Sequence, residues 1–291
     1  MNQFREKYDK LRGEDRYLNI SALFIFYFPF VLRILYRLRI PHEVVTVTHI
    51  ALGIFAAVNI WHNQLVTAAI LFHFKDIFDA CDGALARLTG RGHRIGRFLD
   101  TLGDFVSISA VFGVVAYREF AVTGHLFWLI LGSMTILSVF IQCSYFNFYQ
   151  LKYVEFSATR TLLSRTDEGI TPDDKKLYKN QTLNVFVLLL QRLYKFIFGW
   201  QDYLINRLDQ RMVKSISDDK QSDFYQISWY HNKPWMTATS ALCFGTHIFT
   251  MVICLLLGEP QAALWIISIG FNTYLIALLL YKKCVFSRSK Q

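Results

Sequence analysis

The sequence predicts an all-α integral membrane protein whose helices cross the bilayer six times. Of its 291 residues, 53% are hydrophobic, with 26 Phe and 15 Tyr, a composition typical of polytopic membrane proteins rather than of soluble cores. Six apolar segments are each long enough to cross a bilayer as a helix. These segments are residues 43–61, 64–87, 95–117, 124–150, 235–257 and 261–281.

The N-terminal residues 1–42 read as a polar tail followed by a juxtamembrane helix. The first eighteen residues contain nine charged side chains and no apolar core, so no cleavable signal peptide is expected. Residues 19–39 are apolar at first and basic later, with Arg33, Arg37 and Arg39 at nearly helical spacing. This pattern favours an amphipathic helix lying on the membrane surface, and an additional span is the alternative.

Charge distribution indicates which ends of the spans face the cytoplasm. The connections 61–64, 117–124 and 258–261 together hold one basic residue, Arg118, whereas the other connections and both tails hold nearly all the rest. By the positive-inside rule, the turn at 88–94 and the adjoining ends of its two spans face the cytoplasm. The net charge of +9 is therefore explained by basic residues that set the topology and contact anionic lipid head groups on the cytoplasmic side. No nucleic-acid partner is expected.

The connection from 151 to 234 is long for a six-span core. Residues 182–200 are apolar but interrupted by Gln191, Arg192 and Lys195. Their uninterrupted apolar run is short for a span, so we expect an amphipathic helix in the cytoplasmic interface, with a seventh span as the alternative. The five cysteines have no paired spacing, and no disulfide or zinc framework is expected.

An acidic cluster lies where the second and third predicted spans meet. Asp79 and Asp82 are three residues apart, and Asp100 and Asp104 are four apart, so each pair lies on one face of its own helix. A carboxylate at membrane depth costs roughly 2.5–3.5 kcal/mol, so four together need a cation. Oxygen ligands of this kind select Mg²⁺, Mn²⁺ or Ca²⁺. A buried ion-pair network with nearby basic residues is the structural alternative.

The residues around the cluster complete a recognisable pattern. The chain reads Asp79-x2-Asp82-Gly83-x2-Ala86-Arg87-x8-Gly96-x3-Asp100-x3-Asp104. It resembles the signature of the CDP-alcohol phosphotransferases, D-x2-D-G-x2-A-R-x8-G-x3-D-x3-D, at every fixed position. Upstream, Pro41 and Thr46 match a family element in which His42 replaces the usual Asn.

The resemblance implies a role for each of these residues. Asp79, Asp82 and Asp100 would hold one divalent ion, Mg²⁺ or Mn²⁺, and Asp104 would either complete a second metal site or lie beside the acceptor as the general base. Two ions are expected in all. The cytidine diphosphate of the donor would contact residues of the signature and one upstream threonine. These are Asp79, Asp82, Gly83, Ala86, Arg87 and Thr46.

The acceptor site is less well defined by the sequence. Arg91, Arg94 and Arg97 lie beside the carboxylate helices and are candidates to bind an anionic acceptor, or they are topology-setting charges. The polar end of the fourth span, which includes Ser144 and Asn147, is a further candidate. Lys75 and Asp76 lie outside the signature and suggest a head-group or ion contact. His49 is expected to be a hydrogen-bonded core residue.

The resemblance implies a membrane enzyme of phospholipid biosynthesis that transfers a phosphoryl-alcohol, from CDP-diacylglycerol, to an acceptor alcohol with release of CMP. The alternative within the family is a CDP-choline or CDP-ethanolamine donor acting on diacylglycerol. An Asp-rich prenyltransferase would need a second acidic motif, and a divalent-cation transporter would place its site near the bilayer midplane. The resemblance is also compatible with a homodimer.

The predicted organisation follows from these elements. Residues 1–42 form the cytoplasmic tail and juxtamembrane helix, and 43–150 form the transmembrane catalytic core with the Asp motif. Residues 151–234 form a cytoplasmic or interfacial connection, and 235–291 form the last two spans with a basic tail. We expect the active site to face the cytoplasm.

Overall fold

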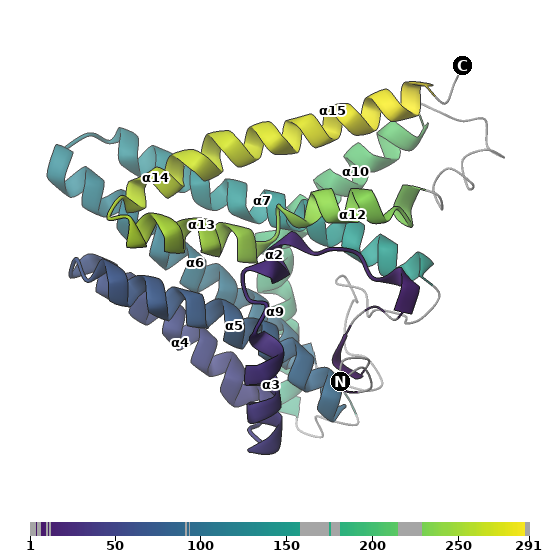
Figure 1. Cartoon of the computed structure of the whole chain (residues 1–291), viewed down its shortest axis with the longest axis horizontal. Coiled ribbons are helices and arrows are strands. Elements are labelled where there is room, and N and C mark those ends of the chain that lie inside the picture. The colour runs from purple at the N-terminus through teal and green to yellow at the C-terminus, as the bar shows by residue number, and fades with distance from the viewer. Residues whose placement is uncertain are drawn as a thin grey trace.

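The computed structural model describes residues 13–90, 94–157, 181–214 and 229–288, together with residues 4, 7–9, 11, 92 and 175. Most of these residues are helical and none is in a β-strand, which confirms the predicted all-α class (Figure 1). The elements, in chain order, are η1 (Gly13–Asp15), α2 (Ile20–Leu23), α3 (Phe28–Arg37), α4 (His42–Trp61), α5 (Leu65–Thr89), α6 (Arg94–Thr123), α7 (Phe127–Phe156), α9 (Gln181–Tyr194), η2 (Lys195–Gly199), α10 (Trp200–Lys214), α12 (Lys233–Ser240), α13 (Phe244–Leu256), α14 (Pro260–Trp265), η3 (Ile266–Phe271) and α15 (Asn272–Arg288).

Six helices among the described residues are long and apolar enough to cross a membrane, which confirms an integral membrane protein with the predicted number of candidate spans. Five of them coincide with predicted spans: α4, α6, α7, α12 with α13, and α14 to α15. The sixth is residues Thr182–Val213, in place of the predicted 64–87. The helix α5 carries the charged residues of the acidic motif, yet it packs between α4 and α13 inside the bundle.

Residues 182–200 are predicted to be too short to cross the membrane, and this prediction is wrong as far as length is concerned. In the structure α9, η2 and α10 form one continuous helical stretch, and Thr182–Val213 is long and apolar enough to span. Two of its contacts are nevertheless with the halves of other helices that the sequence predicts to lie toward the cytoplasm. Tyr194 packs on Phe98 near the start of α6, and Ser144 in the second half of α7 donates a hydrogen bond to Gln201, 2.9 Å long.

The helix α3 supports the surface-helix interpretation of residues 19–39. It has ten residues, about 15 Å in length, which is half of a bilayer core of about 30 Å. Pro29 lies in its first turn, where a missing N–H costs no hydrogen bond. Leu32 and Leu35 are buried, while Phe30 and Ile34 are exposed, so one face packs on the protein and another is apolar and uncovered.

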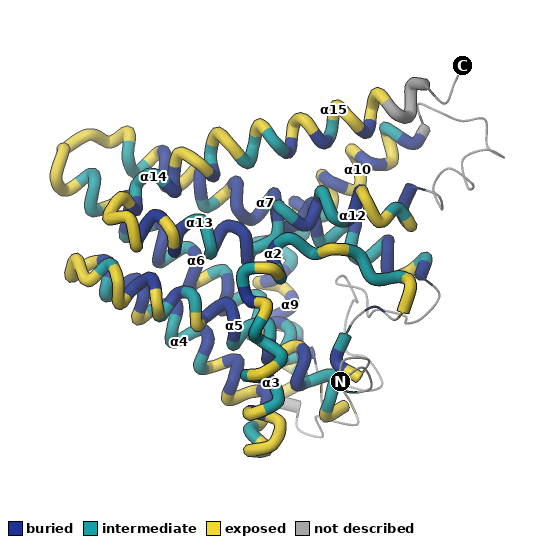
Figure 2. Tube along the Cα trace, viewed as in Figure 1, coloured by how far each residue is buried: buried dark blue, intermediate teal, exposed yellow. Residues whose placement is uncertain are grey.

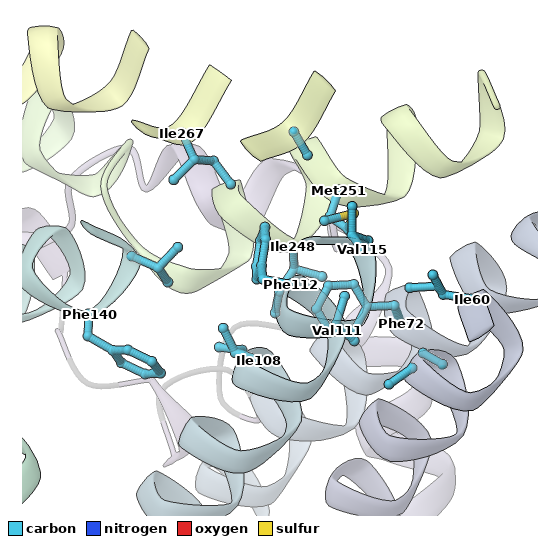
Figure 3. Close-up of a cluster of buried hydrophobic side chains, with 14 of the residues drawn as sticks. Ile60, Phe72, Ile108, Val111, Phe112, Val115, Phe140, Ile248, Met251 and Ile267 are labelled. Atoms are coloured by element: carbon cyan, nitrogen blue, oxygen red, sulfur yellow. The ribbon is translucent and has the colours of Figure 1, made fainter. Parts of the chain in front are cut away.

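The main core joins the helices around the acidic motif to the rest of the bundle. Figure 3 shows its central side chains converging from α4, α5, α6, α7 and α13, among them Ile60, Phe72, Phe112 and Met251. In Figure 2 buried residues follow the interior faces of these helices, and exposed ones follow the outer faces of α4 and α15. The apolar interior thus fixes the relative positions of α4, α5 and α6.

Small residues let α4 and α6 approach closely. A Cβ added at Gly53 would lie 2.3 Å from Cβ of Ser107, and one added at Gly103 would lie 2.2 Å from Cδ1 of Ile50. Real Cβ atoms do not approach so closely, so a larger residue at either position would force the helices apart or displace the neighbouring side chain. The close approach brings the N-terminal half of α4 against the acidic turns of α6.

A second, fully paired polar group lies away from the acidic motif. Asp209 on α10 is 1% exposed and forms an ion pair with Lys282 on α15. The hydroxyl of Tyr149 on α7 donates to Asp209 at 2.7 Å, and the hydroxyl of Tyr230 donates to the other carboxylate oxygen. The ion pair joins α10 to α15, the Tyr149 hydrogen bond joins both to α7, and together with Tyr230 they satisfy the buried carboxylate.

Candidate active site

Two helices supply the four carboxylates, and the turn between them explains how they meet. Gly90 follows the last residue of α5 with φ +65°, a left-handed conformation that glycine adopts without strain. The chain then reverses and α6 begins at Arg94. Asp79 and Asp82 on α5 therefore face Asp100 and Asp104 on α6, as the spacing predicts.

The helix α4 contributes an imidazole to this cluster. His49 is fully buried, with Nε2 3.1 Å from Oδ1 of Asp100 and Nδ1 3.9 Å from Oδ1 of Asp104. Neither ring nitrogen makes a hydrogen bond of good geometry to any described residue, and the same holds for Oδ1 of Asp100. The imidazole thus lies between Asp100 on one side and Asp104 on the other, and these buried polar atoms lack good hydrogen bonds, a costly arrangement unless a cation binds beside them.

Two groups of side chains in the described residues have ligand atoms close enough to hold a metal ion. His49, Asp82 and Asp100 form one group, and His49, Asp79 and Asp104 form the other; within each, the ligand atoms lie within 4.8 Å of one another. Carboxylate oxygens with one imidazole suit Mg²⁺ and Mn²⁺, with the nitrogen favouring Mn²⁺. The residues present thus fit a divalent ion.

A lysine also enters the cluster. Lys75 lies one helical turn before Asp79 on α5 and is fully buried. Its ammonium nitrogen forms an ion pair with Asp104 and lies 3.4 Å from Oδ2 of Asp79. The ion-pair network considered as the structural alternative is therefore present in part, since one cation faces two of the four carboxylates.

Thr46 holds one of the carboxylates in place. Its hydroxyl donates a hydrogen bond to Oδ2 of Asp82, 2.5 Å long, and both side chains are buried. Thr46 and His49 are three residues apart and lie on the same face of α4. This bond orients Asp82 toward the cluster, a common arrangement behind metal ligands.

Gly83 and Arg87 border the cluster on its open side. Gly83 is exposed, and a Cβ added there would meet only the guanidinium of Arg87, with Nη1 at 3.4 Å. Helix packing therefore does not require this glycine. Arg87 is fixed rather than loosely extended toward head groups, because its Nε donates a 2.6 Å hydrogen bond to the backbone carbonyl of Tyr8.

The predicted acceptor residues are only partly described. Arg91 lies outside the described residues. Arg94 and Arg97 both place their guanidinium groups over the ring of Phe98, each 5.6 Å from its centroid, near the start of α6. Ser144 and Asn147 line a small cavity between α6, α7, η2 and α13.

The spacing predicts the facing carboxylates, and Lys75 is one of the basic residues that could pair with them, but His49 is not predicted as a member of the cluster. His49 was expected to be a hydrogen-bonded core residue, whereas it faces Asp100 and Asp104. One signal was available for each: His49 follows Thr46 by three residues, and Lys75 precedes Asp79 by four. Both spacings place the side chain on the face that carries a motif residue.

The fold and the site together define a helical membrane protein with an acidic, metal-competent centre between three packed helices. A family model described as CDP-alcohol phosphatidyltransferase matches residues 40–206, more than half of the chain, and the chain belongs to that family. The family is one of phosphotransferases, so the chain is a transferase that uses a CDP-linked alcohol and an alcohol acceptor. Searches of curated proteins and of solved structures found no match.

Proposed function

We propose that this protein transfers the phosphatidyl group of CDP-diacylglycerol to the hydroxyl of a second alcohol and releases CMP, as a step of phospholipid biosynthesis. The observation that carries the proposal is the convergence of Asp79, Asp82, Asp100 and Asp104 with a buried imidazole in a member of this family. A CDP-choline or CDP-ethanolamine donor acting on diacylglycerol is the second candidate, because the same motif serves it.

In this proposal the diphosphate of the donor lies against the open side of the cluster. Mg²⁺ or Mn²⁺ bound by the Asp motif would neutralise the diphosphate and stabilise charge on the entering and leaving oxygens. Gly83 leaves room for the ligand, because only the guanidinium of Arg87 lies within 4 Å of a Cβ placed there. Arg87 lies four residues further along the same helix face, and its planar, charged guanidinium can donate hydrogen bonds to phosphate oxygens. Ala86 and Thr46 complete the proposed nucleotide contacts.

Asp104 is the proposed general base. It would accept the proton of the acceptor hydroxyl as that oxygen bonds to the phosphorus carrying diacylglycerol, while the bond from that phosphorus to the CMP oxygen breaks. The ion pair with Lys75 keeps the Asp104 carboxylate charged and fixed in direction. Arg94 and Arg97 are the described candidates for an anionic acceptor, with Arg91 as a third.

We propose that the active site faces the cytoplasm and that the α9–α10 stretch lies in the same interface. The basic connections and tails support the first point. Two contacts support the interfacial position of α9–α10: Tyr194 packs on Phe98, and Gln201 accepts a hydrogen bond from Ser144. Phe98 and Ser144 lie in the halves of α6 and α7 that are predicted to face the cytoplasm. A homodimer is part of the proposal, and mass measurement in detergent tests it.

The experiment that tests the function is CMP release by the purified protein in detergent with Mg²⁺ or Mn²⁺. CDP-diacylglycerol is offered as donor with serine, glycerol phosphate or inositol phosphate, and the Asp104→Asn variant is the control. Acceptor-dependent CMP release that is lost in Asp104→Asn supports the proposal and identifies the acceptor. Release only from CDP-choline or CDP-ethanolamine with diacylglycerol would select the second candidate, and no release from any donor would refute both.

A further inference from the structure

Lys75 occupies an unusual position for a charged residue in this fold. It is 0% exposed and lies in the part of α5 where Phe72 and Ile77 are also fully buried. A lysine at such a position keeps its charge only through close anionic partners. Its partners are Asp104 and Asp79.

Those two partners are the carboxylates of one of the two candidate metal groups. The group formed by His49, Asp79 and Asp104 therefore already has an ammonium ion between its carboxylates. The other group uses His49, Asp82 and Asp100. Within the described part of the chain, no ion pair joins Lys75 to either carboxylate of that group.

An ammonium ion and a divalent cation compete for the same oxygen atoms. A metal ion bridging Asp79 and Asp104 would lie next to the Lys75 ammonium, and the two like charges would repel each other strongly in a water-poor site. Lys75 is fully buried, so moving it away would leave its charge without these partners. The lysine and a second metal ion therefore exclude each other.

We propose that the protein holds one divalent ion, bound by His49, Asp82 and Asp100, and that the Lys75 ammonium takes the second cation position. This deepens the proposed function and revises the expectation of two metal ions. Asp104, held by Lys75, then coordinates no metal and accepts the acceptor proton. Lys75 is a positioning residue for Asp104 and supplies a fixed positive charge beside the reacting phosphoryl group.

The test is to count bound Mn²⁺ per chain by calorimetric titration and electron paramagnetic resonance, after removal of metal with EDTA. We expect one ion in the wild-type protein and a second ion in Lys75→Met, whose unbranched side chain fits the same space without the charge. The matched control is Lys152→Met, which removes a half-exposed lysine on α7 and should keep one ion. Two ions or none in the wild type, or one in Lys75→Met, overturn the proposal.

A second comparison keeps the test decisive if Lys75→Met fails to fold. Asp104→Asn should still bind one Mn²⁺, with an affinity within about threefold of that of the wild type. Asp82→Asn should bind Mn²⁺ at least about tenfold more weakly, as expected for loss of a direct ligand. Equal weakening in both variants overturns the proposal. Because counting metal requires neither nucleotide nor acceptor, these outcomes are independent of whether the proposed transferase activity is found.

Discussion

Replacing Gly83 by alanine should stabilise the protein and impair donor binding at the same time. Gly83 lies inside α5, six residues before its last residue, and an added Cβ meets only Nη1 of Arg87 at 3.4 Å. Alanine in a helix interior is favoured over glycine by roughly 0.5–1 kcal/mol. For a chain of this size that corresponds to an increase of about 1–4 °C in the apparent Tm.

The loss of donor binding follows from the same open space. If the donor diphosphate approaches the backbone at Gly83, the new methyl group occupies part of its position. We expect KM for the CDP-linked donor to rise by at least about tenfold, which corresponds to about 1.4 kcal/mol. Thermal unfolding in detergent and CMP release at varied donor concentration measure the two effects on one preparation.

Gly103→Ala is the matched control for this substitution. At Gly103 the added Cβ would lie 2.2 Å from Cδ1 of Ile50 and 2.3 Å from its Cγ1, so α4 and α6 must separate or Ile50 must move. Such overpacking costs about 1–3 kcal/mol, and the apparent Tm should fall below that of Gly83→Ala. An unchanged KM in Gly83→Ala would refute the assignment of the glycine to the donor, and a lowered Tm would refute the packing argument.

Three further substitutions test single contacts. Thr46→Val removes the hydroxyl that donates to Asp82 and should weaken Mn²⁺ binding about 10–100-fold, as loss of such a supporting bond does; titration with Mn²⁺ measures it, and unchanged affinity would exclude an orienting role. His49→Phe removes the imidazole beside the carboxylates and should also weaken Mn²⁺ binding, whereas equal affinity would show that His49 is no ligand. Asp209→Leu leaves Lys282 buried without its counter-charge and should cost about 3–5 kcal/mol; an apparent Tm equal to that of the wild type would contradict this.

The facing positions of the four carboxylates could be predicted from the sequence because they depend on local helix geometry. Spacings of three and four residues fix a common face on each helix, and a short turn closed by Gly90 brings the two faces together. These relations need no knowledge of the rest of the bundle. The same is true of the all-helical class, which follows from long apolar runs.

The contacts of His49 with the carboxylates and of Lys75 with Asp104 could not be predicted in this way, because they depend on how closely separate helices approach. His49 reaches the carboxylates only because Gly53 and Gly103 let α4 and α6 pack closely. Neither glycine belongs to the family signature. The course of α9 and α10 depends in the same way on contacts such as that of Asp209 with α15, which no hydropathy pattern contains.

The ion pair between Asp209 and Lys282 also sets an order for assembly of the chain. The two residues are 73 positions apart, so α10 leaves the ribosome well before the lysine that neutralises it. Until the last helix has been inserted, the partners of Asp209 among the described residues are the hydroxyl groups of Tyr149 and Tyr230, and burial of its charge is costly. We therefore expect α10 to dock against α7 late in biogenesis, after the C-terminal helix has been inserted.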